Sequence, residues 1–243
     1  MMETRDIIIV PGAYDALSAR LIEAAGFEVV YMTGFGTAAS LFGYPDAGLV
    51  TMTEVVDNAR RIAEAVNIPV IAGADTGYGN PINVVRTVQA YEDAGVAGIH
   101  IEDQVWPKKC GHMARKELIP IEDMVEKVRA AVDARRSKDF MIIARTDAIA
   151  VEGLEGALER AREYYRAGAD VIFVEGPENM EQIEAIAKEL RGISLLFNWV
   201  GPGSKTPLID LETLKRFGYK IVIFPVALLF AATKVMRGGA QHN

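Results

Sequence analysis

The chain contains a single cysteine, Cys110, among its 243 residues, so no disulfide can form within it. One cysteine is typical of proteins in a reducing compartment. Positive charge is also scarce, because 26 lysines and arginines stand against 33 aspartates and glutamates and leave a formal charge of −7. General nucleic-acid binding requires a basic face that meets phosphates. We therefore expect neither a disulfide framework nor a nucleic-acid partner.

Long apolar segments are missing as well. The longest apolar run, residues 221–233, is interrupted by Pro225 and falls short of the roughly 20 residues that a membrane-spanning helix needs. A buried strand that leads into a helix is the better interpretation of this run. Residues 1–6 include acidic side chains and lack the apolar stretch of a signal peptide. We expect a cytoplasmic protein with no membrane partner.

Eight short apolar runs, rich in valine and isoleucine, recur along the whole chain. They do not alternate with polar residues, which is typical of parallel strands covered by helices on both faces. Segments with helical periodicity separate them, and several of these end in a glycine that can cap a helix. The apolar runs are residues 7–10, 29–32, 69–74, 98–101, 141–144, 171–174, 194–197 and 220–224.

Eight strands that are each followed by a helix predict an α/β fold, a single (β/α)8 TIM barrel over residues 1–243, with a doubly wound sheet as the alternative. Two connections, 35–52 and 104–120, are longer than a helix and its turns require. Long loops after barrel strands usually cover the substrate. The helices are expected at 16–25, 53–66, 83–94, 121–135, 154–167, 180–190 and 211–217.

Acidic side chains follow the third and fourth predicted strands, where barrels build their active sites. Asp75, Glu102 and Asp103 stand there, and Asp46 in the first long connection is able to join them. Carboxylate oxygens are the ligands that Mg²⁺ prefers, so the pattern indicates a metal site. The alternative is that these acids cap the helices or turns that follow.

Arg145 ends the fifth predicted strand. A guanidinium binds a carboxylate through two parallel hydrogen bonds, so Arg145 is a candidate anchor for an acidic substrate. An internal salt bridge to Glu102 or Glu175 is an equally good interpretation. His100, inside the fourth run, is expected to be a satisfied core histidine. The glycine-rich segment 200–205 is either a phosphate cradle or a turn that closes over the site.

Cys110 lies in the sequence KKCGH, residues 108–112, within the second long connection. Neighbouring positive charge lowers the pKa of a thiol, and a thiol tuned in this way can exchange a proton near neutral pH. A lone cysteine is more often a small buried hydrophobe. The flanking lysines favour the functional interpretation here.

Several motifs together resemble the isocitrate lyase and phosphoenolpyruvate mutase superfamily. They are PGAYDALSA at 11–19, DTGYGN at 75–80, IEDQ at 101–104, KKCGH at 108–112, ARTDA at 144–148 and the strand end at Asn198. KKCGH is typical of the carbon–carbon lyase branch, which includes 2-methylisocitrate and 2,3-dimethylmalate lyases and, close in size, a carboxyphosphonate mutase group. The resemblance extends from residue 10 to residue 225.

The resemblance implies cleavage of a carbon–carbon bond in a small 2-hydroxy or 2-oxo dicarboxylate through an enolate-like intermediate. It implies Mg²⁺, with Mn²⁺ as the alternative ion. Cys110 is then the proton donor, Arg145 stabilises the enolate, and Tyr31 assists with the hydroxyl proton. Asp46, Asp75 and Glu102 bind the metal, largely through water. The substrate-binding residues are Thr33, Gly34, Phe35, Gly111, His112, Arg145, Glu175 and Asn198.

The chain departs from the family pattern at several positions. Gly73 stands where a metal-binding aspartate is usual, Phe230 stands about where larger-substrate lyases carry an arginine, and Arg115 replaces a common glycine. The family's N-terminal helix and its C-terminal exchanged helix are expected to be missing. A homo-oligomer, dimer or tetramer, is implied. The alternatives are an oxaloacetate decarboxylase or hydrolase, and a barrel that binds a dicarboxylate without turning it over.

Overall fold

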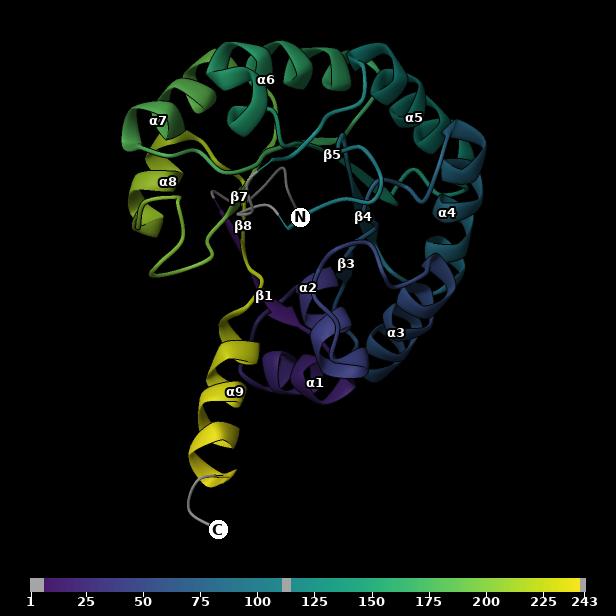
Figure 1. The fold of residues 1–243 in the computed structure, drawn as a ribbon, viewed down its shortest axis with the longest axis vertical. Coiled ribbons are helices and arrows are strands. Elements are labelled where there is room, and N and C mark those ends of the chain that lie inside the picture. The colour runs from purple at the N-terminus through teal and green to yellow at the C-terminus, as the bar shows by residue number, and fades with distance from the viewer. Residues whose placement is uncertain (1–6, 111–114, 241–243) are drawn as a thin grey trace.

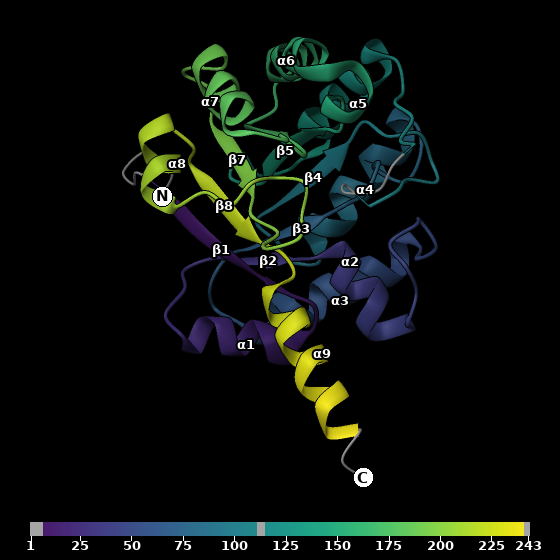
Figure 2. The ribbon, with the colours of Figure 1, turned by 60° about the vertical axis from the view of Figure 1, so that its left-hand side comes forward.

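A computed structural model describes residues 7–110 and 115–240. Eight parallel strands pair in chain order and close into a barrel, with helices around the outside (Figures 1 and 2). Pairing of the first strand with the eighth closes the cylinder, so the (β/α)8 prediction is confirmed and the doubly wound sheet is wrong. The strands are β1 (Ile8–Ala13), β2 (Val30–Met32), β3 (Val70–Gly73), β4 (Gly98–Glu102), β5 (Met141–Thr146), β6 (Val171–Val174), β7 (Leu195–Asn198) and β8 (Ile221–Phe224).

The helices begin where the local sequence satisfies their free amide groups. Asp15 caps the first helix by accepting a hydrogen bond from Ser18 N at 2.7 Å, and Thr51 with Glu54 forms a capping box. The helices are α1 (Ala16–Ala24), α2 (Gly34–Thr37), α3 (Met52–Ala65), α4 (Pro81–Asp93), α5 (Ile121–Ala134), α6 (Ile149–Arg166), α7 (Met180–Glu189), α8 (Leu211–Phe217) and α9 (Ala227–Ala240), with a π-helix, η1 (Ala38–Phe42), after α2.

The two long connections differ in structure. Part of the segment expected as a loop, 35–52, folds into α2 and η1. The segment 104–120 is closed at its base by an isolated antiparallel bridge between Gln104 and Leu118. Among residues 7–110 and 115–240, no helix has the length and apolar character needed to cross a membrane.

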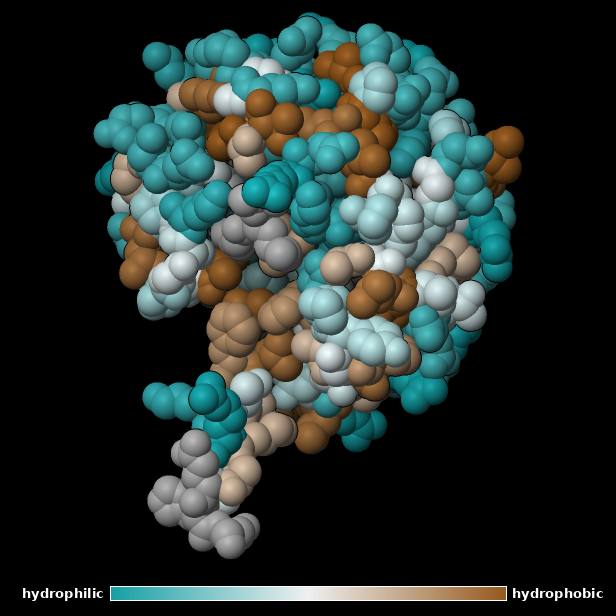
Figure 3. Space-filling model, viewed as in Figure 1, coloured by the Kyte–Doolittle hydropathy of each residue, from teal (hydrophilic) through white to brown (hydrophobic). Residues whose placement is uncertain are grey.

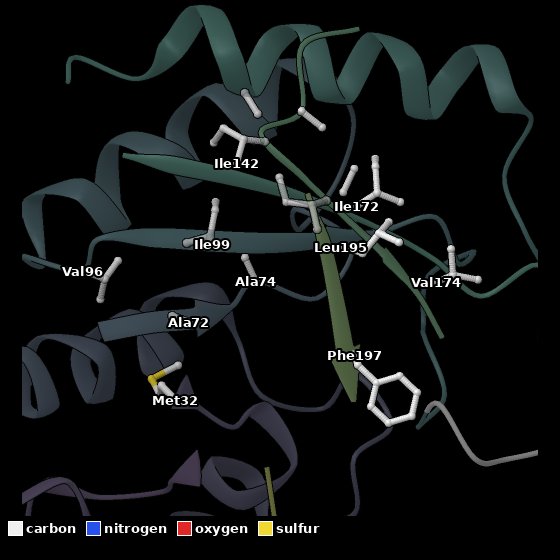
Figure 4. Packing of buried hydrophobic residues seen from close by; sticks show 14 of the residues in the cluster. Met32, Ala72, Ala74, Val96, Ile99, Ile142, Ile172, Val174, Leu195 and Phe197 are labelled. Atoms are coloured by element: carbon white, nitrogen blue, oxygen red, sulfur yellow. The ribbon is translucent and has the colours of Figure 1, made fainter. Parts of the chain in front are cut away.

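Side chains alternate along each strand, which divides the core into two parts. Outward side chains, such as Ile99, Ile142 and Ile172 in Figure 4, pack between the barrel and its helices. Inward side chains, such as Val10 and Phe173, fill the barrel itself. The same alternation decides which residues at the carboxyl ends of the strands reach the mouth of the barrel.

Helix α9 contacts β1 and then extends away from the barrel (Figure 1). Apolar surface lies where it leaves the body of the protein (Figure 3). Phe230, Val235 and Met236 on this helix are all exposed.

Candidate active site

A cavity of about 310 Å³ opens at the carboxyl ends of the strands. Most of the residues predicted for the site line it, and they come from six strands, β2 to β7, or the segments that follow them. Gly111 and His112 lie outside the described residues. The predicted residues on the cavity wall are Tyr31, Thr33, Gly34, Phe35, Asp46, Asp75, Glu102, Cys110, Arg145, Glu175 and Asn198.

Strand register brings the charged groups to one level. Glu102 pairs with Arg145 across β4 and β5, and Gly73 pairs with His100 across β3 and β4. Residues on the same face of a strand are two apart, so His100 and Glu102 both point inward. A helical turn at the end of β2, capped by the Thr33 hydroxyl accepting from Gly36 N at 3.2 Å, places Thr33 beside them.

Asp103 points the other way. Its carboxylate accepts hydrogen bonds from the Thr146 hydroxyl at 2.7 Å, the Tyr164 hydroxyl at 2.8 Å and Asp147 N at 2.9 Å. Arg160 Nη1 lies 3.4 Å from it. We call Asp103, Thr146, Arg160 and Tyr164 the outer cluster. The prediction that Asp103 joins the metal-binding acids is therefore wrong, because strand alternation turns it away from the cavity.

The helix-capping alternative is also wrong for both acids. Asn80, not Asp75, caps α4 by accepting from Ile82 N at 3.0 Å, and α5 begins after Pro120. Asp75 instead has a left-handed backbone, with φ of 45°, which is rare for a residue other than glycine. Strained backbone of this kind concentrates at functional sites.

Arg145 is surrounded by carboxylates. Its Nε and Nη2 donate to the two oxygens of Asp147 at 2.9 and 3.0 Å, and Nε lies 3.4 Å from Glu102 Oε2. Nη1 lies 3.9 Å from Glu175 Oε2, and the guanidinium sits 5.0 Å above the Phe173 ring. The internal salt bridges are therefore present, and Arg145 also borders the cavity. A guanidinium held so firmly is already oriented for a ligand carboxylate.

The mouth of the cavity holds more carboxyl groups than cationic side chains. Burial raises the pKa of Glu102 to about 8 although Arg145 and Lys108 oppose the shift. Burial also raises the pKa of Asp75, against the opposing charge of Lys108. The carboxylates of Asp46, Asp75, Glu102 and Glu175, with Lys108 and Arg145, are called the inner cluster below.

Lys108 is a site residue that sequence reasoning treated only as a neighbour of Cys110. Its side chain is 6% exposed, and its ammonium group donates a hydrogen bond to Asp46 Oδ1 and lies 3.2 Å from Asp75 Oδ1. Burial alone would lower the pKa of Lys108, but Asp75, Glu102 and Asp46 outweigh it and raise the pKa. The lysine thus stays charged between the acids.

Gln104 fixes the segment that carries Cys110. Its Nε2 donates to Glu102 Oε1 at 3.0 Å and to the Lys109 carbonyl at 2.8 Å, while its Oε1 accepts from Lys109 N at 3.0 Å. Cys110 is half-buried and lies on the cavity wall. The side-chain amide therefore connects a predicted metal ligand to the predicted proton donor.

His100 was expected to be a satisfied core histidine, and this is only half right. Its Nε2 lies 2.7 Å from the Tyr31 hydroxyl, but Nδ1 is buried and has no hydrogen-bond partner among the described residues. Burial lowers the pKa of His100 to about 3, so the ring is neutral. The ring borders the cavity beside Gly73, where an added Cβ would come within 3.2 Å of Nε2. His100 precedes Glu102 by two residues on the same strand, and this spacing could have predicted that both side chains face the cavity.

The opposite wall of the cavity is more apolar. Phe35 and Phe230 meet edge to face with ring centroids 6.3 Å apart, and Val226 lies nearby on the wall. Val200 and Gly203 bring the segment 200–205 to the cavity edge. Pro202 and Ser204 of the same segment also line the cavity, and the phosphate cradle and the covering turn both stay predictions.

The carboxylate oxygens at the mouth of the cavity are ligands of the type that Mg²⁺ prefers. Asp46 and Asp75 converge on Lys108, and Glu102 faces the same cavity. Mg²⁺ binds a few carboxylates and keeps several waters, so these residues fit such an ion without a closed cage. Within the described part of the chain, no three acidic, histidine or cysteine side chains gather closely enough to hold a metal by themselves. The three-ligand set remains a prediction.

An eight-stranded parallel barrel with acids, an arginine and a thiol around one cavity at its carboxyl end defines a barrel enzyme. The family model described as phosphoenolpyruvate phosphomutase matches residues 1–242. The chain belongs to the phosphoenolpyruvate mutase/isocitrate lyase superfamily and is a carbon–carbon lyase of that superfamily, which confirms the resemblance noted in the motifs.

Three known proteins illustrate the similarity. The 2,3-dimethylmalate lyase of Eubacterium barkeri is 51% identical over 236 residues, covering 97% of this chain and 81% of that protein. The structure of oxaloacetate acetylhydrolase with 3,3-difluorooxalacetate aligns with a TM-score of 0.94 and 42% identity, over 98% of this chain and 81% of that one. Phosphonopyruvate hydrolase with oxalate and Mg²⁺ aligns with a TM-score of 0.86 and 34% identity, over 96% of this chain and 80% of that one.

Proposed function

We propose that the protein is a Mg²⁺-dependent lyase that cleaves a carbon–carbon bond in a small 2-hydroxy dicarboxylate. The observation that carries this proposal is that Arg145, Cys110 and the acids Asp75 and Glu102 line one cavity of about 310 Å³. The Mg²⁺ complex of phosphonopyruvate hydrolase, at 34% identity, supports the choice of ion. Mn²⁺ is the alternative ion.

The chemistry divides among the residues of the cavity. Tyr31, held by His100, takes part in removing the hydroxyl proton, and the bond between the two central carbons then breaks. One fragment leaves as a 2-oxo acid and the other as an enolate, which Cys110 protonates on carbon. Arg145 binds the substrate carboxylate through two hydrogen bonds and stabilises the developing charge. A bound Mg²⁺ would neutralise further negative charge in the enolate.

The apolar wall sets the proposed substrate class. Phe35, Val226 and Phe230 favour a hydrocarbon branch and provide no partner for a third carboxylate. This agrees with the similarity to 2,3-dimethylmalate lyase. Thr33, Gly34, Glu175 and Asn198 are proposed to hold the dicarboxylate portion, because they line the polar part of the cavity.

Product analysis tests the proposal. The purified protein with Mg²⁺ is incubated with 2,3-dimethylmalate, 2-methylisocitrate and oxaloacetate, and the products are followed by proton NMR. We expect two organic fragments from the dialkylmalate and little reaction with the tricarboxylate. Intact substrates throughout would reject the lyase proposal.

Hydrolysis of oxaloacetate is the second candidate, favoured by the 42% identity to oxaloacetate acetylhydrolase. It uses the same enolate stabilisation and depends less on Cys110. Oxalate and acetate as products identify hydrolysis, whereas pyruvate and CO₂ identify decarboxylation. Tight, Mg²⁺-dependent binding of oxalate by calorimetry, without turnover of any acid, would identify a barrel that only binds.

We also propose that the protein is a cytoplasmic homo-oligomer. The single cysteine suits a reducing compartment, and the exposed apolar residues of α9 need cover in water. Light scattering after size-exclusion chromatography measures the assembly directly. A mass of 26.5 kDa, that of one chain, would reject the oligomer.

A further inference from the structure

We propose that the Lys108 ammonium and a divalent cation are alternative occupants of the Asp46–Asp75 carboxylate pair, so that metal binding displaces Lys108. The inference rests on the metal dependence in the proposed function and concerns how this chain controls it. Lys108 then acts as an internal cation that keeps the two acids together until the metal arrives.

The position of Lys108 is the first observation. Its ammonium donates to Asp46 and lies 3.2 Å from Asp75, and these two acids come from separate connections, after β2 and after β3. The Lys108 side chain is 6% exposed, while those of Asp46 and Asp75 are 13% and 16% exposed. Lys108 therefore occupies the point between the two carboxylates where a bound cation would bridge them.

Simple electrostatics makes the two occupants exclusive. An ammonium group and a divalent ion on the same oxygens would lie within about 4 Å of each other, where like charges repel strongly in a partly buried site. A metal that binds there must therefore pay for breaking the contacts of Lys108, and its apparent affinity falls accordingly.

Gly73 strengthens the argument. It lies on the wall of the same cavity and contributes no carboxylate there. With no carboxylate from this position, the single charge of Lys108 offsets a larger share of the negative charge of Asp46 and Asp75.

Metal affinity in variants is the main test, measured as Mn²⁺ binding by electron paramagnetic resonance without any substrate. Lys108→Met removes the competing cation, so we expect Mn²⁺ to bind roughly ten- to hundred-fold more tightly than to the unmodified protein. Lys109→Met is the matched control, because its ammonium contacts the Arg115 carbonyl and not the acids, and its affinity should stay the same. Unchanged or weaker binding to Lys108→Met, or no binding to any of the three proteins, would overturn the inference.

A second measurement uses the unmodified protein and decides the matter if Lys108→Met does not fold. Acetylation of lysines is followed by mass spectrometry with increasing Mn²⁺. We expect Lys108 to become more reactive over the range in which Mn²⁺ binds, with Lys109 unchanged. Constant protection of Lys108 at saturating Mn²⁺ contradicts displacement.

The two proposals fail separately. Tighter metal binding by Lys108→Met, together with no cleavage of any acid by the unmodified protein, keeps this inference and rejects the lyase proposal. Cleavage of the dialkylmalate, together with equal Mn²⁺ affinity of the unmodified protein and Lys108→Met, keeps the lyase proposal and rejects this inference.

Discussion

Two buried charged clusters lie on opposite sides of the barrel wall. Two consecutive residues at the end of β4 belong to different clusters. Glu102 belongs to the inner cluster at the cavity, and Asp103 belongs to the outer cluster between strand and helix. Asp103 accepts hydrogen bonds from Thr146, Tyr164 and a backbone amide. At the cavity that Glu102 faces, some buried polar atoms lack a hydrogen bond. His100 Nδ1 and Asn198 Oδ1 have no hydrogen-bond partner among the described residues.

The comparison shows which property distinguishes Glu102 from Asp103. Burial raises the pKa of Glu102, and burial followed by repulsion from Asp147 raises that of Asp103 as well. A shifted pKa alone would therefore have selected both carboxylates. The distinguishing features are an adjoining cavity and polar atoms whose hydrogen bonds are left for a ligand.

Cys110→Ser tests the inner side and should have the largest effect. A serine hydroxyl is a far weaker proton donor, so we expect kcat to fall by roughly 10²- to 10⁴-fold on whichever acid is cleaved. Thermal unfolding should be unchanged, because Cys110 is half-buried at the cavity edge. An unaltered kcat would remove the thiol from the mechanism.

Asp103→Ala tests the outer side. It leaves the hydroxyls of Thr146 and Tyr164 and the amide of Asp147 without their buried acceptor, so the free energy of unfolding should fall by about 3 to 5 kcal/mol. The kcat of the folded fraction should change little. Urea unfolding measures the loss, and Asp133→Ala, at an exposed position on α5, is the control. Loss of kcat with full stability would mean that the outer cluster takes part in the reaction.

Asp147 connects the two clusters and gives a pH dependence. Burial would raise its pKa, but Arg145 and Lys116 outweigh burial and lower it from 3.8 to about 2. A carboxyl with a lowered pKa stabilises the fold above pH 3.8, and this contribution, roughly 2 kcal/mol, is lost as the pH falls through about 2. The stability gap between the unmodified protein and Asp147→Asn, measured with urea, should therefore narrow from pH 5 to pH 2. A gap that stays constant contradicts the assignment.

Gln104→Ala should have the smallest effect. It removes hydrogen bonds that position the Cys110 segment, each worth about 1 kcal/mol, so we expect kcat to fall by roughly ten-fold. KM should change less, because Gln104 does not line the cavity. Gln89→Ala, on the exposed face of α4, is the control, and equal kcat values for the two variants would reject a positioning effect of Gln104.

Local sequence was sufficient to predict every strand and most helices. Valine-rich runs predicted strands that end within a few residues of those observed, because strands buried on both faces require continuous apolar sequence. The helix after Gly153 was predicted, but the turn before it, which extends α6 back to Ile149, was missed. The turn is too short to show helical periodicity, and Gly153, with φ of 76°, interrupts the helix directly after it.

Sequence alone therefore determined the barrel, the edge at which the site lies and the acids, arginine and thiol that gather there, since strand ends of a parallel barrel meet at one rim. Only the tertiary structure decided which neighbours face the cavity. Strand register turned Glu102 inward and Asp103 outward, and folding of the segment 104–120 carried Lys108 between Asp46 and Asp75. The physical reason is that the direction of a side chain and the residues it contacts depend on strands and loops distant along the chain. No local sequence pattern contains that information.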